Sequence, residues 1–494
     1  MKNQIKKLNN HAEVLVLGSG MGSLTAAALL ANSGRQVTVI EQNYLPGGCS
    51  SSYFRQGFVF ESGATTLVGL DKGMPLRYLL DKTGICLDSK KLEKPMLVQL
   101  KTGETLTRHQ DLDAWIAEAE SVFGPVGQRP FWEHCYKVSK FVWNSSLSQL
   151  SFPPSSFKDL GPMLAGFQFK QLAFANYAFM SMEQLLKKFG LLHNEKFIDF
   201  VNEQLLITAQ NTISAVNVLF GATALCYTNY DNSYVYGGMI QMINPIIDFI
   251  KSNKGEIRLR CGAQKISYQQ KKYWVETNEG TISADYLISG IPINNLLEIW
   301  TDEKLQRKYK NRILTSPQLN SAFQMGIGFE RAGNQPLTAL HHQVHLAKPL
   351  AQIGSKSIFL SLSDPIDWYR APLGQAVASV STHIPNPEVN RIRDKEELEQ
   401  IIIETLHQKR LIDKASINYY HASGAMSWER WTGRKYGFVG GYPQYMHIKP
   451  WQMLDARIDG KGAYLCGDTA YPGQGIPGVC LSGIIAWRKF SIDH

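Results

Sequence analysis

The chain has 494 residues, of which 44% are hydrophobic and 11% aromatic, so it can bury large cores and is not a disordered protein. Its length favours two domains over one. The net charge of +9 comes from lysines and arginines that are scattered along the chain. This pattern argues against nucleic acid as a partner and is compatible with an anionic membrane surface.

The seven cysteines are widely spaced and form no Cys-x-x-Cys pair. We therefore expect free thiols in a reducing compartment, with neither a disulfide framework nor a zinc site. The basic start MKNQIKK and the apolar residues 14–31 superficially resemble a secretory signal, but polar residues including Glu13 interrupt the transition. No other apolar run reaches the length of about 18 residues that a membrane-spanning helix needs. The expected location is cytoplasmic, with peripheral attachment to a membrane.

The first predicted elements form a βαβ unit. An apolar strand at residues 14–17 leads through a glycine turn into a small-residue helix that ends near Asn32, and a β-branched strand follows at residues 37–40. Such a unit, with glycines between the first strand and the helix, is typical of dinucleotide-binding domains.

Four small residues and one acid give this unit its chemistry. Gly18 permits the tight turn, and Gly20 lets the backbone approach a pyrophosphate at the helix N-terminus. Ser23 takes the place of the third fingerprint glycine, with Gly22 beside it. Glu41 ends the second strand, where its carboxylate can accept hydrogen bonds from the adenosine ribose.

The fingerprint does not separate NAD from FAD, because both carry adenosine diphosphate. The next segment does, since Gly47 and Gly48 follow the acid and two short strands are predicted around Gln56-Gly57. The stretch EQNYLPGGCSSSYFRQGFVFESGATTLVGL resembles the flavin-dependent amine oxidase and phytoene desaturase superfamily, in which such a glycine loop lies along FAD. It is most similar to the carotenoid desaturase and isomerase branch, especially its 3,4-desaturase-like members, although Phe60-Glu61 replaces a common Phe-Asp pair.

Residues 234–289 are a second segment that we expect to belong to the cofactor domain. A glycine pair, an amphipathic helix that ends near Lys254, a hairpin at Glu279-Gly280 and a strand at 286–289 are predicted. The resemblance implies that this block completes the FAD domain and that the strand from Ala263 offers backbone groups to the adenine. A further βαβ piece without ligand contact is the alternative.

Residues 76–232 are rich in Phe, Met, Leu and Tyr, with lysines between them. This composition suits a helical lobe that lines a long apolar tunnel and touches lipid at its mouth. An ordinary helical core with solvated lysines is the alternative. The resemblance to the desaturase branch extends through this lobe and so spans nearly the whole chain.

A second lobe is predicted at residues 294–454, and it contains two groups of residues that could bind a ligand. His341, His342 and His345 lie on a predicted strand, where the first two face opposite sides, and no carboxylate cluster supports them, so no metal site is expected. Arg430 and Arg434 fall in a segment that resembles one passing close to the flavin. They are either structural ion-pair partners or residues that shape the flavin edge.

The last motif is GAYLCGDTAYPGQGIPGVCLSG. A strand leads to Gly467-Asp468, and the resemblance implies that this acid hydrogen-bonds the ribityl or pyrophosphate end of FAD. Only a residue without a side chain lets the backbone come so close to a cofactor. Pro477 fits the first turn of the helix that follows, whose free N–H groups then point at the flavin ring.

The predicted fold is α/β, with a Rossmann-type FAD-binding domain built on a doubly wound parallel sheet and an inserted α+β substrate domain with a helical lobe. The FAD domain comprises residues 12–75, 233–293 and 455–494, and the substrate domain comprises residues 76–232 and 294–454. The predicted FAD-binding residues are Gly18, Gly20, Met21, Gly22, Ser23, Glu41, Gly47, Gly48, Cys49, Ala263, Gly467, Asp468, Gly475, Ile476 and Pro477.

No Ser-His-Asp order, Cys-His pair or carboxylate dyad is recognisable, and no catalytic residue is named. The resemblance implies an FAD-dependent oxidoreductase for a long apolar polyene, with carotenoid desaturation by hydride transfer to flavin as the leading hypothesis. Isomerisation, or saturation of a retinoid-like polyene, uses the same parts on reduced flavin. Amine oxidation shares the cofactor domain, and a flavin-holding membrane module without turnover is a non-enzymatic possibility. The absence of cysteine between Cys261 and Cys466 argues only against one covalent FAD linkage.

Overall fold

The computed structural model describes residues 10–167, 171–332, 334 and 338–494. Its first large sheet has parallel strands in the order β10-β2-β1-β13-β19, and β12 and β11 extend it as an antiparallel hairpin on the first half of β13. The strands are β1 (His11–Leu17), β2 (Val37–Glu41), β10 (Glu256–Leu259), β11 (Ala263–Gln269), β12 (Lys272–Thr277), β13 (Gly280–Ser289) and β19 (Ala463–Leu465). The predicted Rossmann-type sheet is confirmed.

Helices α1 (Met21–Asn32), α10 (Ile240–Ser252) and α15 (Ile476–Asp493) pack together on this sheet, with α2 (Pro75–Thr83) against α15. Helix α1 is buried from Met21 to Ala31, because its residues are small or apolar on every side. A side chain at Gly483 would collide with the carbonyl oxygen of Gly22. Glycine at that position therefore lets α15 cross α1 at close range.

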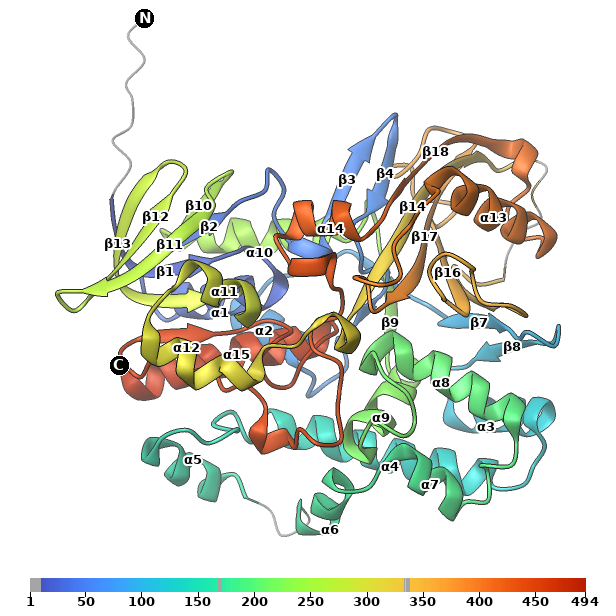
Figure 1. Ribbon diagram of the computed structural model, residues 1–494, viewed down its shortest axis with the longest axis horizontal. Coiled ribbons are helices and arrows are strands. Elements are labelled where there is room, and N and C mark those ends of the chain that lie inside the picture. Colours follow the sequence, from blue (N-terminus) through green and yellow to red (C-terminus); the bar gives the residue numbers. More distant parts are fainter. Residues whose placement is uncertain (1–9, 168–170, 333, 335–337) are drawn as a thin grey trace, which may run out of the picture.

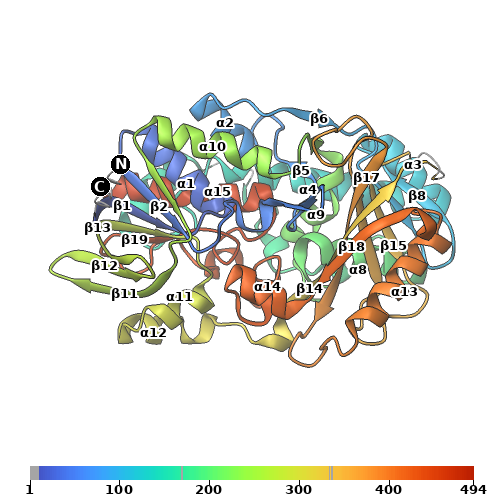
Figure 2. The same cartoon turned by 90° about the horizontal axis from the view of Figure 1, so that it is seen from above.

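The second large sheet is mixed, in the order β18-β14-β17-β16-β15-β7-β8, and only the β15–β7 pair is parallel. Its strands are β7 (Met96–Gln99), β8 (Thr105–Arg108), β14 (Asn320–Glu330), β15 (His341–His345), β16 (Ser357–Leu362), β17 (Gln375–Pro385) and β18 (Ile417–Ser423), and α13 (Lys395–Gln408) packs on it. The two large sheets lie at opposite ends of the molecule (Figure 2).

Smaller elements connect the two ends. The predicted pair of short strands is present as the hairpin β3 (Ser52–Arg55) and β4 (Phe58–Glu61), whose Phe60 ring lies where a side chain at Gly326 of β14 would stand. A three-stranded sheet joins β5 (Leu67–Val68), β9 (Asn232–Val235) and β6 (Ser89–Lys91). Helices α11 (Ile293–Ile299) and α12 (Glu303–Tyr309) flank the first sheet, and α14 (Ala425–Thr432) lies between the two large sheets, in contact with β14.

The predicted helical lobe lies below both sheets in Figure 1. It consists of α3 (Leu112–Phe123), α4 (Gln128–Ser146), α5 (Leu160–Ala165), α6 (Leu172–Ala175), α7 (Met182–Lys188), α8 (Glu195–Ala209) and α9 (Val218–Leu225). Within the described ranges, no helix is both long enough and apolar enough to cross a bilayer. The division of the chain into a cofactor part and a substrate part remains a proposal.

Candidate cofactor and substrate sites

A cavity of about 310 Å³ opens where β1 and β2 end and α1 begins, and we call it the glycine cavity. The structure gathers in its wall all but three of the residues that the sequence predicted for FAD. They are Gly18, Gly20, Met21, Gly22, Ser23, Glu41, Gly47, Gly48, Cys49, Ala263, Gly467 and Asp468. The other three, Gly475, Ile476 and Pro477, line a second cavity beside the first.

The backbone of the glycine cavity requires residues without side chains. Gly47 and Gly467 have φ angles of +100° and +94°, which other residues rarely adopt. A Cβ at Gly22 would lie 2.8 Å from the backbone nitrogen of Gly467, so the start of α1 touches the last motif directly. Among the described residues, no heavy atom lies within 4 Å of the position a Cβ would take at Gly20, which leaves that backbone open.

The carboxylate of Glu41 is held in a fixed orientation. Its Oε2 accepts hydrogen bonds from the backbone nitrogen of Ser19 at 2.8 Å and from the Ser19 hydroxyl at 2.7 Å. Its Oε1 accepts one from the backbone nitrogen of Asn43 at 2.9 Å. These bonds fix Glu41 at the carboxyl end of β2, the position from which an acid reaches a ribose in dinucleotide-binding folds.

Asp468 forms a bidentate ion pair with Arg434. The Arg434 Nη1 and Nη2 atoms donate to the two carboxylate oxygens at 2.8 and 3.1 Å, and the two side chains are only 12% and 15% exposed. Burial lowers the pKa of Arg434 while the Asp468 carboxylate raises it, and the net change is a rise. Arg434 is therefore an ion-pair partner, the first of the two roles considered for it. It also lines the glycine cavity. Arg430 is exposed on α14.

The cavity wall includes residues that the sequence did not mark. Asn295 on α11 and Trp431 on α14 line it, and the Asn295 Oδ1 and Trp431 Nε1 atoms are buried with no hydrogen-bond partner in the described part of the chain. Buried polar atoms are nearly always paired, so an acceptor and a donor without partners in one cavity indicate a polar ligand. Together with the open glycine backbone and the N-terminus of α1, these residues fit a dinucleotide.

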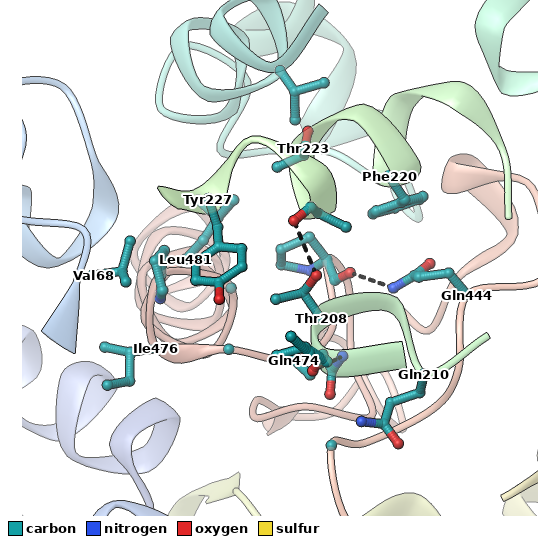
Figure 3. Close-up of a pocket in the computed structure, with 18 of the residues that line it drawn as sticks. Val68, Thr208, Gln210, Phe220, Thr223, Tyr227, Gln444, Gln474, Ile476 and Leu481 are labelled. Carbon is teal, nitrogen blue, oxygen red and sulfur yellow. Dashed lines mark hydrogen bonds between the residues drawn. The ribbon is translucent and has the colours of Figure 1, made fainter. Parts of the chain in front are cut away.

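The second cavity, of about 860 Å³, lies between α15, the helical lobe and the second sheet, and we call it the apolar cavity. Cys49 lines both cavities, so they adjoin at that residue. Among its described lining residues there is no Asp, Glu, Lys or Arg. The Thr208 hydroxyl donates to the carbonyl of Ala224 at 3.2 Å (Figure 3). The Thr223 hydroxyl donates to the carbonyl of Leu219 at 2.8 Å, so both hydroxyls add little polarity.

Comparison with known proteins identifies the family. The family described as flavin containing amine oxidoreductase matches residues 24–487. The chain belongs to this family. FAD, the cofactor predicted from the segment that follows Glu41, is thereby confirmed, and the chain is a flavin-dependent oxidoreductase.

Individual relatives cover nearly all of this oxidoreductase. It is 24% identical to the chloroplastic prolycopene isomerase of Arabidopsis thaliana over 97% of this chain and 83% of that protein. It is 22% identical to a 4,4'-diapolycopene oxygenase of a Methylomonas species over 98% of this chain and 99% of that one. The solved structure of cyclohexylamine oxidase from Brevibacterium oxydans has the same fold, with a TM-score of 0.60, 14% identity and coverage of 98% of both chains.

The three histidines on β15 are neutral in this oxidoreductase. Burial lowers the pKa of His341 to about 3 and that of His345 to about 4, and it lowers the pKa of His342 as well. His341 hydrogen-bonds Thr66 and Ser361 at 3.0 and 2.8 Å. Within the described part of the chain, no group of three or more His, Cys, Asp or Glu side chains is arranged to hold a metal ion. All seven cysteines are free thiols.

Proposed function

We propose that this oxidoreductase acts on a long apolar polyene and that its reaction is the desaturation of a carotenoid. The observation that carries the proposal is the apolar cavity, whose described lining contains no ionised side chain and which adjoins the glycine cavity at Cys49. A hydrocarbon has no group for charge pairing, so a site of this kind suits it. The volume of about 860 Å³ lies near the upper end of the range of roughly 300–1,000 Å³ for small-molecule sites.

Separate residues of this chain would hold the successive parts of FAD. We propose that the start of α1 takes the pyrophosphate, that Glu41 takes the ribose, and that Asp468, oriented by Arg434, takes a hydroxyl group of the ribityl chain. When bound, FAD would supply the oxidant that accepts a hydride from one carbon of the substrate. The adjacent carbon would lose a proton to solvent, to a weak base or to the reduced flavin, and a C=C bond would form. Gly475 is the N-cap of α15 and Pro477 lies in its first turn, both at the apolar cavity, where the free N–H groups of the helix favour negative charge.

The same cavity argues against an amine substrate. An ammonium group buried in a low-dielectric cavity needs a carboxylate partner, and the described lining of the apolar cavity has none. The histidines there do not replace one, since burial lowers the pKa of His341 to about 3 and that of His383 to about 4. The similarity to cyclohexylamine oxidase therefore supports the fold and not the substrate.

Isomerisation of a polyene is the second candidate. It is favoured by the prolycopene isomerase of Arabidopsis thaliana, with which 97% of this chain aligns. Both reactions need the same dry cavity next to the flavin. They differ in the product, because desaturation removes two hydrogens whereas isomerisation leaves the mass unchanged.

We further propose that the mouth of the apolar cavity lies on a membrane. Leu160, Leu164, Phe167 and Trp451 line the cavity and are also exposed, and Phe157 nearby is 92% exposed. Exposed apolar side chains around a cavity mouth are typical of surfaces that dock on lipid. An apolar substrate would then reach the cavity from the bilayer without crossing water.

Incubation of the purified FAD-loaded protein with lycopene or phytoene in liposomes, with and without oxygen, tests the reaction. Desaturation predicts a product that is lighter by two hydrogens for each new double bond, measured by chromatography with mass detection. An Asp468→Ala variant is the matched control and should give no product. If amines reduce the bound flavin and polyenes neither reduce it nor change, the proposal is wrong.

A further inference from the structure

Among the uncharged polar residues that line the apolar cavity are Gln210, His383, Gln444 and Gln474, and we call this group the amide corner. All four residues line the cavity, and Figure 3 shows the three glutamines on the same side of it. Gln210 caps the C-terminus of α8 with a φ of +55°, and Gln474 directly precedes Gly475, the N-cap residue of α15. None of these side chains takes part in the proposed FAD contacts.

The hydrogen bonds of Gln210 leave one atom without a partner. Its Nε2 donates to the carbonyl oxygen of Leu206 at 3.0 Å and lies 3.0 Å from the Nε2 of His383. Both amide hydrogens are then in use, with the imidazole nitrogen as an acceptor. The Gln210 Oε1 is buried and has no hydrogen-bond partner among the residues that the structure describes, and the residue is only 5% exposed.

Two successive glycines place this corner beside the proposed flavin site. A Cβ at Gly440 would collide with the Gln474 Oε1 and lie 2.9 Å from the Gln210 Cδ. A Cβ at Gly441, the next residue, would lie 2.7 Å from the Cβ of Asp468. The consecutive residues Gly440 and Gly441 therefore lie between the amide corner and Asp468 of the glycine cavity.

We propose that the amide corner binds a hydroxyl group at one end of the polyene, with the Gln210 Oε1 accepting its hydrogen bond. This inference rests on the proposed function and narrows its substrate class to polyene alcohols. A free carbonyl oxygen on Gln210 needs a donor, which a hydroxyl has and a hydrocarbon, ketone or ether lacks. The hydroxyl-bearing end of the polyene, rather than its middle, then lies next to the N-terminus of α15.

The surroundings of the corner support a neutral donor over a charged one. Burial lowers the pKa of His383 to about 4, so its ring is uncharged at neutral pH and can accept the hydrogen of Gln210. No carboxylate is among the described residues of the apolar cavity to hold an ammonium group. A site built to pair a hydroxyl discriminates against the analogue without it, because the buried acceptor is then left unpaired.

Equilibrium binding of matched polyenes to the FAD-loaded protein in detergent micelles tests the inference. The probes are lycopene, lycopene with one terminal hydroxymethyl group, and the methyl ether of that alcohol, followed by quenching of tryptophan fluorescence. We expect the alcohol to bind at least about tenfold more tightly than lycopene, equivalent to about 1.4 kcal/mol, and the ether to resemble lycopene. Gln210→Met should remove the preference and leave the affinity for lycopene unchanged.

Thr223→Val is the matched control, because the Thr223 hydroxyl lines the same cavity but already donates to Leu219. It should leave the preference for the alcohol intact. If the alcohol binds no more tightly than lycopene, or no more tightly than the ether, the proposed role of the amide corner is wrong. The comparison with the ether uses the unmodified protein, so it does not depend on a variant that could misfold. Equal weakening of all probes by Gln210→Met also overturns the proposed role, since the residue then only packs. A protein that binds none of the polyenes refutes the proposed function itself.

Discussion

Replacement of Asp468 by alanine removes both carboxylate oxygens that Arg434 binds, at 2.8 and 3.1 Å. The guanidinium is left without its partner at a position that is only 12% exposed. Breaking a pair of this burial costs about 3 kcal/mol, which for a chain of 494 residues lowers the Tm by about 3 °C. If Asp468 also binds the ribityl chain, the same variant loses FAD.

A double-mutant cycle separates these two effects. Arg434→Met alone should destabilise the protein by a similar amount, and the double variant should lose less than the sum, by about 2 kcal/mol, because no unpaired charge remains. FAD binding should be lost with Asp468→Ala and with the double variant, but only weakened with Arg434→Met. Differential scanning fluorimetry of the FAD-free protein and titration with FAD measure the two quantities.

Glu276→Ala is a matched control, because the Glu276–Lys265 pair joins β12 to β11 in the first large sheet and both side chains are more than half exposed. Its loss should change stability by less than about 1 kcal/mol and leave FAD binding unchanged. Full FAD occupancy in Asp468→Ala would contradict the proposed role of this acid. Strictly additive losses of stability would show that the two residues do not act as a pair.

Three further changes test the cofactor site and the cavity. Gly22→Ala places a Cβ 2.8 Å from the backbone nitrogen of Gly467 and should cost about 1–3 kcal/mol and weaken FAD binding, whereas Gly161→Ala, with open space around it, should do neither. Glu41→Arg should weaken FAD binding at least tenfold in a fluorescence titration, and an unchanged affinity would remove Glu41 from the ribose site. The pKa of His341 is about 3 in the folded chain against an ordinary 6.5, so the unfolded chain takes up a proton first as the pH falls. The free energy of unfolding should therefore drop by about 2 kcal/mol between pH 6.5 and 5, and His341→Gln should show a correspondingly smaller drop; an identical pH dependence would mean that this histidine is not neutral in the fold.

The first and last motifs could be predicted because each needs a backbone conformation that favours glycine. Gly18 and Gly467 have φ angles of +83° and +94°, and glycine marks such positions in a sequence. The helix signals were equally local, since Pro477 lies in the first turn of α15 as expected. The prediction for Asp468 was incomplete, because its partner Arg434 is 34 residues away and either of two roles fitted the sequence.

Other parts of the site carry no sequence signal. Asn295 and Trp431 lie on short helices in segments assigned to the substrate part, yet both line the glycine cavity. A single Asn or Trp on a helix is most often a surface or packing residue, and the neighbouring residues in the sequence do not show that it lines a cavity. An unpartnered buried Oδ1 or Nε1 can be recognised only when the whole surroundings are known.

The sequence by itself determined the βαβ unit, the positions of the glycines that predict FAD binding and the helix that contains Pro477, because each depends on residues within one short segment. Only the tertiary structure decided what the apolar cavity contains. Gln210 ends α8, His383 lies on β17 and Gln474 precedes α15, and folding brings these distant segments together. Periodicity records which face of an element is buried, but not which polar atoms meet there. The composition of the predicted lobe therefore led to the proposal of an apolar substrate, and the arrangement of a few amides supports the proposal of its end group.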